Sequence, residues 1–339
     1  MHYKRFYGAV RGDFLDRQIS SVLTRYKIPK TLFLVNRMKK AYVNDDWNPD
    51  EYILFHYEDL SPKARHAFVM QNEGSRFRHM VNTPTIHNLF LDKSITYNYF
   101  KDFYRRELVK ITEKENQISA FSAFVNEYDN IVIKSLKEAG GEGVKMMQTR
   151  NEKGCVDVLY ENLWKEYPEG FLLEERIIQS PDLAIFHPAS VNTVRLTTYK
   201  YDGKVELIHR PFIRFGQGDA IVDNGAKGGI IASIDFETGI ITSAIDELGK
   251  HYIVHPDSGK TILGFHIPYW KEAKEMALTL MNIIPDAKYI GWDLALTNEG
   301  WVMVEGNSRG LFIGFQLPNQ MGWREEYEEI KEKMRIKCK

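Results

Sequence analysis

The spacing of apolar and polar positions divides the chain into a helical first third and a β-rich remainder. From Phe14 to about Lys114 the apolar residues recur at spacings of three and four, as in "FLDRQISSVLTRY", which is typical of amphipathic helices. Ser61 followed by Pro62 is typical of a helix start, because serine caps a first turn and proline is tolerated there. We therefore expect an N-terminal, mainly helical domain over residues 1–115.

Near Asn130 the pattern changes. "NIVIKSL" predicts a short β-branched strand, "KEAGGEG" a glycine turn, and "VKMMQT" a second strand. "VDVLYENLWKEY" then has helical spacing, and "GFLLEERII" indicates a return to strand. We assign residues 116–190 to a small domain built from these elements.

Beyond residue 190 the pattern is mostly β. "VNTVRLTTYKYDGKVELIHRPFIRF" predicts a hairpin around Asp202-Gly203, and "GGIIASIDFETGIITSAIDE" predicts another around Glu237-Thr238-Gly239. A long helix is expected in "YWKEAKEMALTLMNII", with one apolar stripe formed by Ala273, Met276, Ala277, Leu280 and Ile284. A last hairpin joins "YIGWDLALT" to "WVMVEGNSRG". An antiparallel sheet backed by helices, an α+β fold, is predicted for a large domain over 191–330, with a tail at 331–339.

Composition narrows the class of protein. Of the 339 residues, 43% are hydrophobic and 27% charged, which is ordinary for a globular protein. Lys and Arg number 45 against 46 Asp and Glu, so the chain as a whole has no positive electrostatic potential that would attract nucleic acid. Cys155 and Cys338 lie far apart, which argues against a disulfide framework. We expect a cytoplasmic protein without a signal peptide or transmembrane segment; peripheral attachment to a membrane complex stays open, and no oligomeric state is indicated.

The last hairpin carries the strongest chemical signal. Asp293 and Glu305 lie on its two strands, so their carboxylates are expected to be neighbours, and Asn307 shares the face of Glu305. Paired carboxylates in an apolar setting are costly unless a cation neutralises them, and three oxygen ligands suit a hard divalent cation such as Mg²⁺. The alternative is a solvated hairpin edge with ordinary surface acids, and the residues alone do not decide between the two.

Two weaker signals precede it. Lys134 ends an apolar strand and is followed by Gly140, Gly141 and Gly143, which would let backbone N–H groups and a lysine approach phosphate. The glycine spacing is neither a P-loop nor a Rossmann fingerprint, and a plain hairpin turn is the alternative. In "FLLEERIIQSPD", Glu174, Glu175 and the following Asp182 could line a cleft for adenine and ribose, or could belong to a strand edge and a turn.

Over roughly Asp92 to Pro318 the order of these elements resembles the ATP-grasp superfamily. The resemblance implies an ATP-grasp fold, two α+β subdomains clasping ATP, with the N-terminal helical domain added. It also implies roles for individual residues. Lys93 and Lys134 would be the two lysines that bind the nucleotide, and Gly140 to Val144 would form the flexible phosphate loop. Glu175 and the backbone of Ile178 would form the adenine hinge, and Asp182 would be the carboxylate that binds the ribose. The ligands of Mg²⁺, or of Mn²⁺ in its place, would be Asp293, Glu305 and Asn307. "SVNTVRLTTY" followed by "GGIIASIDFETGII" is most similar to sugar-transfer-associated ATP-grasp proteins.

Some positions depart from the family pattern. Ser135, where proline is frequent, follows Lys134, and Gly291-Trp292 precede Asp293 where many ligases of the fold have an arginine. An anion clamp must then come from elsewhere, with three catalytic candidates, Arg195, Lys227 and Arg309. For each of them a solvated or structural salt-bridge role is an equal alternative.

The resemblance implies an ADP-forming carboxylate–amine ligase that works through an acyl phosphate. Its substrates would be a sugar acid, amino acid or glycan precursor together with an amine, and its setting polysaccharide biosynthesis. A kinase of the same fold, which would stop after phosphorylating its substrate, is one alternative. A nucleotide-binding regulatory protein without catalysis is another.

Overall fold

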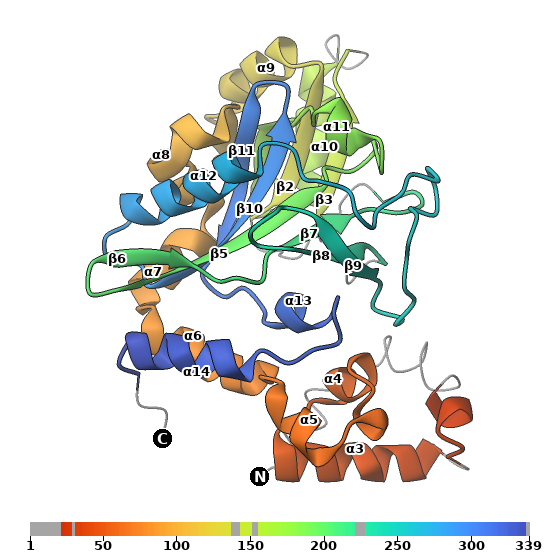
Figure 1. Ribbon diagram of the computed structural model, residues 1–339. Coiled ribbons are helices and arrows are strands. Elements are labelled where there is room, and N and C mark those ends of the chain that lie inside the picture. The colour runs from red at the N-terminus through yellow and green to blue at the C-terminus, as the bar shows by residue number, and fades with distance from the viewer. Residues whose placement is uncertain (1–21, 29–30, 137–142, 151–154, 221–227, 337–339) are drawn as a thin grey trace.

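The computed structural model describes residues 22–28, 31–136, 143–150, 155–220 and 228–336. Its elements form an N-terminal group of helices, a four-stranded sheet and a seven-stranded sheet (Figure 1). Every strand pair in the described part of the chain is antiparallel. The α+β prediction is therefore confirmed.

Short helices fill the N-terminal region. In chain order they are α3 (Thr31–Asp45), α4 (Pro49–Leu54), the 3-10 turn η1 (Tyr57–Asp59), α5 (Pro62–Ala67), α6 (Gln71–Val81), α7 (Pro84–Leu91) and α8 (Lys93–Tyr104). The predicted helix start is confirmed, because the Ser61 hydroxyl accepts a hydrogen bond from the Ala64 N–H at 3.2 Å. Of the helix predicted in "FLDRQISSVLTRY", most lies outside the described residues; Val22 to Arg25 are helical.

The small sheet has the strand order β1-β4-β2-β3. Its strands are β1 (Leu108–Ile111), β2 (Asn130–Ser135), β3 (Val144–Gln148) and β4 (Phe171–Glu175). Helices α9 (Ile118–Glu127) and α10 (Val156–Glu166) cover one face, where Phe171 and Leu173 are buried. Since side chains alternate along a strand, Leu172 and Glu174 point from the opposite face. Strand β1, which lies inside the predicted N-terminal segment, pairs with β4.

The large sheet has the order β11-β10-β5-β7-β8-β9, with β6 paired to β5. Its strands are β5 (Thr193–Tyr201), β6 (Lys204–Leu207), β7 (Phe212–Phe215), β8 (Ile230–Ile234), β9 (Ile241–Ile245), β10 (Tyr289–Thr297) and β11 (Gly300–Asn307). The predicted hairpins are confirmed, as β5 pairs with β6, β8 with β9 and β10 with β11. Asp202 and Gly203, with φ of 44° and 77°, form the turn between β5 and β6, where both residues need positive φ to match the strand twist.

Helices cover both faces of the large sheet. On one face α8 and α12 (Trp270–Ile283) enclose a core in which Ala277, Leu280 and Leu294 are fully buried. The other face packs against the N-terminal helices, α13 (Ile313–Gln316) and α14 (Arg324–Lys333). The one-turn helix α11 (Pro181–Ala184) connects the two sheets. No helix among the described residues is long and apolar enough to cross a membrane.

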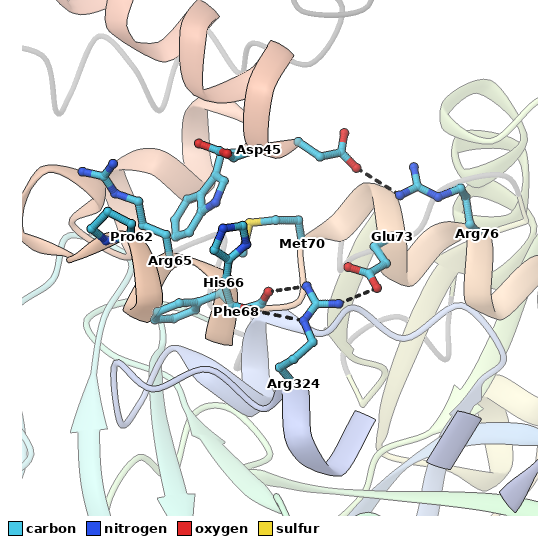
Figure 2. A pocket seen from close by; sticks show the side chains of 11 residues that line it. Asp45, Pro62, Arg65, His66, Phe68, Met70, Glu73, Arg76 and Arg324 are labelled. Atoms are coloured by element: carbon cyan, nitrogen blue, oxygen red, sulfur yellow. Dashed lines mark hydrogen bonds and ion pairs between the residues drawn. The ribbon is translucent and has the colours of Figure 1, made fainter. Parts of the chain in front are cut away.

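Ion pairs join α14 to the N-terminal helices (Figure 2). Arg324 donates to the Glu73 carboxylate at 2.6 Å and to the Phe68 carbonyl at 2.8 Å. Close by, Arg76 pairs with Asp46 at 3.2 Å. These residues line a cavity of about 150 Å³. Because these acids and arginines pair with one another, we interpret the cavity as part of the contact between α14 and the N-terminal helices and not as a ligand site.

A single guanidinium joins the two sheets. Arg106, 6% exposed, contacts the Glu174 carboxylate of β4 at 2.6 Å through both Nε and Nη2. Its Nη1 donates to the carbonyls of Tyr104 at 3.0 Å and Met303 at 2.7 Å, and its Nη2 to that of Val304 at 3.3 Å. All five N–H groups of the side chain are thereby used. Lysine, with three donors on a flexible stem, cannot reproduce this pattern.

We expect Arg106→Lys to lower the free energy of unfolding by about 2–4 kcal/mol, because buried carbonyls and a buried carboxylate lose their donors. Urea denaturation followed by circular dichroism measures the change. Arg105→Lys is the matched control, since exposed Arg105 donates to one group among the described residues, the Glu299 carbonyl at 2.8 Å, and its effect should stay under about 0.5 kcal/mol. Equal losses of unfolding free energy in the two variants would contradict the role of Arg106 in joining the two sheets.

Candidate nucleotide and metal site

The structure brings the three predicted metal ligands together. Asp293 of β10 lies directly opposite Glu305 of β11, and Asn307 lies opposite Gly291. The Asn307 amide donates to Asp293 Oδ2 at 3.1 Å and to Glu305 Oε1 at 2.9 Å. The amide nitrogen therefore occupies the position between two carboxylates that a cation would take. Rotating the amide by half a turn would present its oxygen instead.

These donors fit Mg²⁺ better than a cation that needs a complete protein cage. In the described part of the chain, no three His, Cys, Asp or Glu side chains gather as metal ligands. Two carboxylates and one amide oxygen leave positions for water and phosphate oxygens, which is how Mg²⁺ is usually held. The metal role of the three residues stays a prediction.

Glycine is required between Glu305 and Asn307 by close packing. A Cβ on Gly306 would lie 2.5 Å from Cε1 of Phe90 on α7. The ring of Phe90 also packs against Trp292, with 5.7 Å between ring centroids. The apolar half of the hairpin is thereby anchored directly beside its polar end.

Two arginines neutralise Asp293. Arg195, opposite it on β5, contacts the carboxylate twice, at 2.6 Å through Nε and at 2.8 Å through Nη2. Arg214 on β7 approaches Oδ2 at 3.1 Å. Burial alone would raise the pKa of the Asp293 carboxyl, but the two guanidinium groups outweigh it and lower that pKa to about 2. Asp293 is therefore ionised at neutral pH.

The unusual Gly291 now has a physical explanation. A Cβ at this position would lie 3.1 Å from Cδ of Arg195, and one at Gly310 would lie 3.0 Å from its Nη1. The chain thus places its arginine on the neighbouring strand and leaves space for it on β10. Arg214 was missed in the sequence, because its contact with Asp293 depends on a strand order that no local pattern reveals.

The remaining clamp candidates differ in their surroundings. Arg309 is exposed and makes no ion pair with any described residue. It lies close enough to buried His87 to act on it; burial first, and then the Arg309 charge, lower the pKa of that imidazole. His87 Nδ1 is 2.9 Å from the Ser308 hydroxyl. Lys227 lies outside the described residues.

Lys134 and Glu174 form the small-sheet side of the site. The half-buried Lys134 ammonium donates to the Glu174 carboxylate, which also contacts Arg106. Burial alone would raise the pKa of the Glu174 carboxyl, but Arg106 and then Lys134 lower it to about 2. Gly143, with φ of 64°, and Val144 close the turn opposite Lys134. Gly140 and Gly141 lie outside the described residues.

The residues expected at the adenine and ribose are separated. Glu175 lies on the helix-covered side of β4 and accepts a hydrogen bond from the Glu107 N–H at 3.2 Å. It lines a cavity of about 450 Å³ together with Ile178, which is 76% exposed. Asp182 on α11 lines a different cavity. Their roles toward a nucleotide stay predictions.

Lys93 is the first residue of α8, as expected for a lysine at a helix start. Asp92 caps the helix through the Ser94 N–H at 2.9 Å and pairs with Lys110 at 2.7 Å. Lys93 itself makes no ion pair within the described ranges, so its charge is free for an anion. Lys110 was not identified from the sequence, because its partner lies 18 positions away.

Comparison with solved structures finds several ligases. D-alanyl-alanine synthetase A from Vibrio cholerae is 12% identical, with 73% of this chain and 65% of that one covered and a TM-score of 0.44. The ATP-grasp ligase PsnB with its minimal precursor is 10% identical, with 75% of this chain and 63% of that one covered and a TM-score of 0.44. The D-alanine-D-alanine ligase from Coxiella burnetii is 8% identical, with 73% of this chain and 57% of that one covered and a TM-score of 0.41. The chain thus spans less than two thirds of each of these proteins.

The comparison of sequences is more specific. None of the curated proteins to which the chain was compared matches it. The family model described as sugar-transfer associated ATP-grasp matches residues 72–332, which is most of the chain and includes both sheets. This confirms the resemblance drawn from the Lys134 strand and the β10–β11 hairpin. The chain belongs to the sugar-transfer associated ATP-grasp family.

Proposed function

We propose that this protein is an ATP- and Mg²⁺-dependent, ADP-forming ligase that joins a carboxylate to an amine. The observation that carries the proposal is the meeting of Asp293, Glu305 and Asn307 on two paired strands. Membership of an ATP-grasp family supports it. A protein that bound a nucleotide without Mg²⁺ would have no need of this donor set.

In the proposed reaction, an oxygen of the substrate carboxylate attacks the γ-phosphorus of ATP, giving an acyl phosphate and ADP. The amine then attacks the acyl carbon and releases phosphate as the amide forms. Bound at Asp293, Glu305 and Asn307, Mg²⁺ would neutralise and orient the terminal phosphates. Mn²⁺ would satisfy the same oxygen ligands.

The chain's own residues position the phosphates and hold charge. Lys93 and Lys134 supply point charges for the nucleotide, with Gly143 and Val144 at the edge of the phosphate loop. Lys134 can turn toward phosphate because Arg106 keeps its two contacts with Glu174. The buried carboxylate then remains paired, so the exchange leaves no isolated charge.

Arg309 is the best candidate for the clamp on the carboxylate substrate. Arg195 is committed to Asp293, whereas Arg309 follows the metal strand directly and has no ionic partner among the described residues. A sugar acid, an amino acid or a glycan precursor would each present the required carboxylate. A role in polysaccharide biosynthesis is part of the proposal; the family's description names an association with sugar transfer.

The function is tested by ADP release in a screen of carboxylates paired with amines, with mass spectrometry of the product. We expect Glu305→Gln to lower ADP formation at least about 100-fold and to abolish Mg²⁺-dependent ATP binding, because the site loses one of two carboxylates. Glu299→Gln, in the turn of the same hairpin, is the matched control and should retain activity. Hydroxylamine should trap a hydroxamate in the native protein.

Full activity of the folded Glu305→Gln variant would exclude the metal assignment. Phosphorylated product without a hydroxamate would show a kinase in place of a ligase. Mg²⁺-dependent ATP binding without ADP release from any substrate pair would indicate a nucleotide-binding regulatory protein without catalysis.

We expect Arg309→Met to raise the KM for the carboxylate at least about tenfold while ATP affinity and stability stay unchanged. Arg195→Met should instead lower the free energy of unfolding by about 3–5 kcal/mol, because Asp293 stays buried with one arginine fewer. Steady-state kinetics and urea denaturation separate the two effects. An unchanged KM in Arg309→Met would remove Arg309 from the clamp and leave Lys227 as the candidate.

A further inference from the structure

Two lysines lie in one row across the small sheet. Leu172 of β4 pairs with Lys110 of β1 on one side and with Lys134 of β2 on the other. Directly paired residues of neighbouring strands point to the same face, so both lysines share the face that carries Glu174. With strands about 4.8 Å apart, the two lysine Cα atoms are separated by about 10 Å. Lys110 therefore lies close to the predicted nucleotide lysine, on the same face of the sheet.

Each of these lysines is bound to a carboxylate and remains partly exposed. Lys134 donates to Glu174, and Lys110 donates to Asp92 Oδ2 at 2.7 Å. The Lys134 side chain is 17% exposed and the Lys110 side chain 33%, whereas Leu172 between them is 2% exposed. The two ammonium groups thus flank a buried leucine and are both accessible to a ligand.

Asp92 does not depend on Lys110 for its hydrogen bonds. Its Oδ1 accepts from the Ser94 N–H at 2.9 Å, from the Ser94 hydroxyl at 2.6 Å and from the Ile95 N–H at 3.3 Å. These donors lie at the N-terminus of α8, where the helix dipole favours a negative charge. Burial alone would raise the pKa of the Asp92 carboxyl, but Lys110 and then Ser94 lower it to about 2. If Lys110 left, this carboxylate would keep its capping bonds, as Glu174 would keep Arg106 if Lys134 left.

Positive charge is in excess around these two carboxylates. Lys93 directly follows Asp92 and makes no ion pair with any residue of the described ranges, and Arg106 contacts Glu174. Four cationic side chains thus accompany two acidic ones; the cations are Lys93, Arg106, Lys110 and Lys134, and the acids are Asp92 and Glu174. An excess of two positive charges suits a polyphosphate, whose negative charge is spread over several groups.

We propose that Lys110 is a third lysine of the nucleotide site, which leaves Asp92 and binds a phosphate group of ATP. The inference rests on the proposed function, because it assumes that the nucleotide phosphates lie beside Lys93 and Lys134. An ammonium group on a flexible four-carbon stem can exchange one anion for another without a movement of the backbone. The exchange costs little, because an ion pair that is one third exposed contributes little to stability.

Two variants break the same ion pair and separate a phosphate contact from a brace between β1 and α8. Lys110→Gln removes the cation, and Asp92→Asn removes the anion while asparagine keeps the helix cap. In titration calorimetry on the full chain, we expect Lys110→Gln to weaken Mg²⁺-dependent ATP binding about tenfold and Asp92→Asn to bind ATP at least as tightly as the native protein. Adenosine, which has no phosphate, should bind equally to all three proteins. The melting temperatures of the two variants should be similar.

Lys145 and Glu166 form the matched control pair. They lie on the helix-covered side of the same sheet, 2.9 Å apart, and both side chains are 46% exposed. Lys145→Gln should bind ATP within about twofold of the native protein, because a charge that does not touch the phosphates is screened by salt. Lys110→Arg keeps the positive charge and should bind ATP within about threefold of the native protein.

Unchanged ATP affinity in Lys110→Gln would overturn this inference and leave the proposed function intact. Equal losses of ATP affinity in Lys110→Gln and Asp92→Asn would also overturn it, since they would show that the ion pair acts only as a brace. A native protein without Mg²⁺-dependent ATP binding would overturn both the inference and the proposed function.

Discussion

The contact of Arg106 with both sheets sets the geometry on which the candidate site depends. Its guanidinium touches Glu174 on the small sheet and the carbonyls of Met303 and Val304 on the large one. Glu174 is bonded to Lys134, and Val304 directly precedes Glu305. One planar, rigid group therefore relates the position of Lys134, the predicted nucleotide lysine, to that of Glu305, the predicted metal carboxylate. The proposed phosphoryl transfer would require precise positioning of this kind.

Asp293 shows how the fold solves a like-charge problem. Two carboxylates facing each other across a strand pair would raise each other's pKa and favour a protonated, neutral form. Arg195 and Arg214 prevent this at Asp293 and hold its pKa at about 2. Asp293 and Glu305 carry two negative charges and the two arginines two positive charges, so the cluster is neutral without a cation. If a cation replaced the Asn307 amide, as proposed, Asp293 would keep its arginine partners.

Local patterns in the sequence were sufficient for the hairpins, the helices and the pairing of Asp293 with Glu305, because strand periodicity and turn residues act over a few positions. They could not identify Arg106, whose partners lie 68 and 197 positions away. Glu174 and Glu175 illustrate the same limit. Alternation requires that their side chains point to opposite faces of β4, yet only the packing of Phe171 and Leu173 beneath α9 and α10 shows that Glu174 is the one that meets Arg106 and Lys134.

The charges of the site are arranged so that Lys134 can leave Glu174 at a small cost in free energy. Arg106, Lys134 and Glu174 carry two positive charges and one negative charge, so a phosphate that attracts Lys134 leaves a neutral Arg106–Glu174 pair. Removing the only partner of a buried carboxylate would cost several kcal/mol, whereas a shared carboxylate avoids most of that penalty. The structural role of Arg106 and the mobility that the proposed nucleotide contact requires of Lys134 are therefore two consequences of one arrangement. If Lys134 were the sole partner of Glu174, moving to a phosphate would leave a buried carboxylate unpaired.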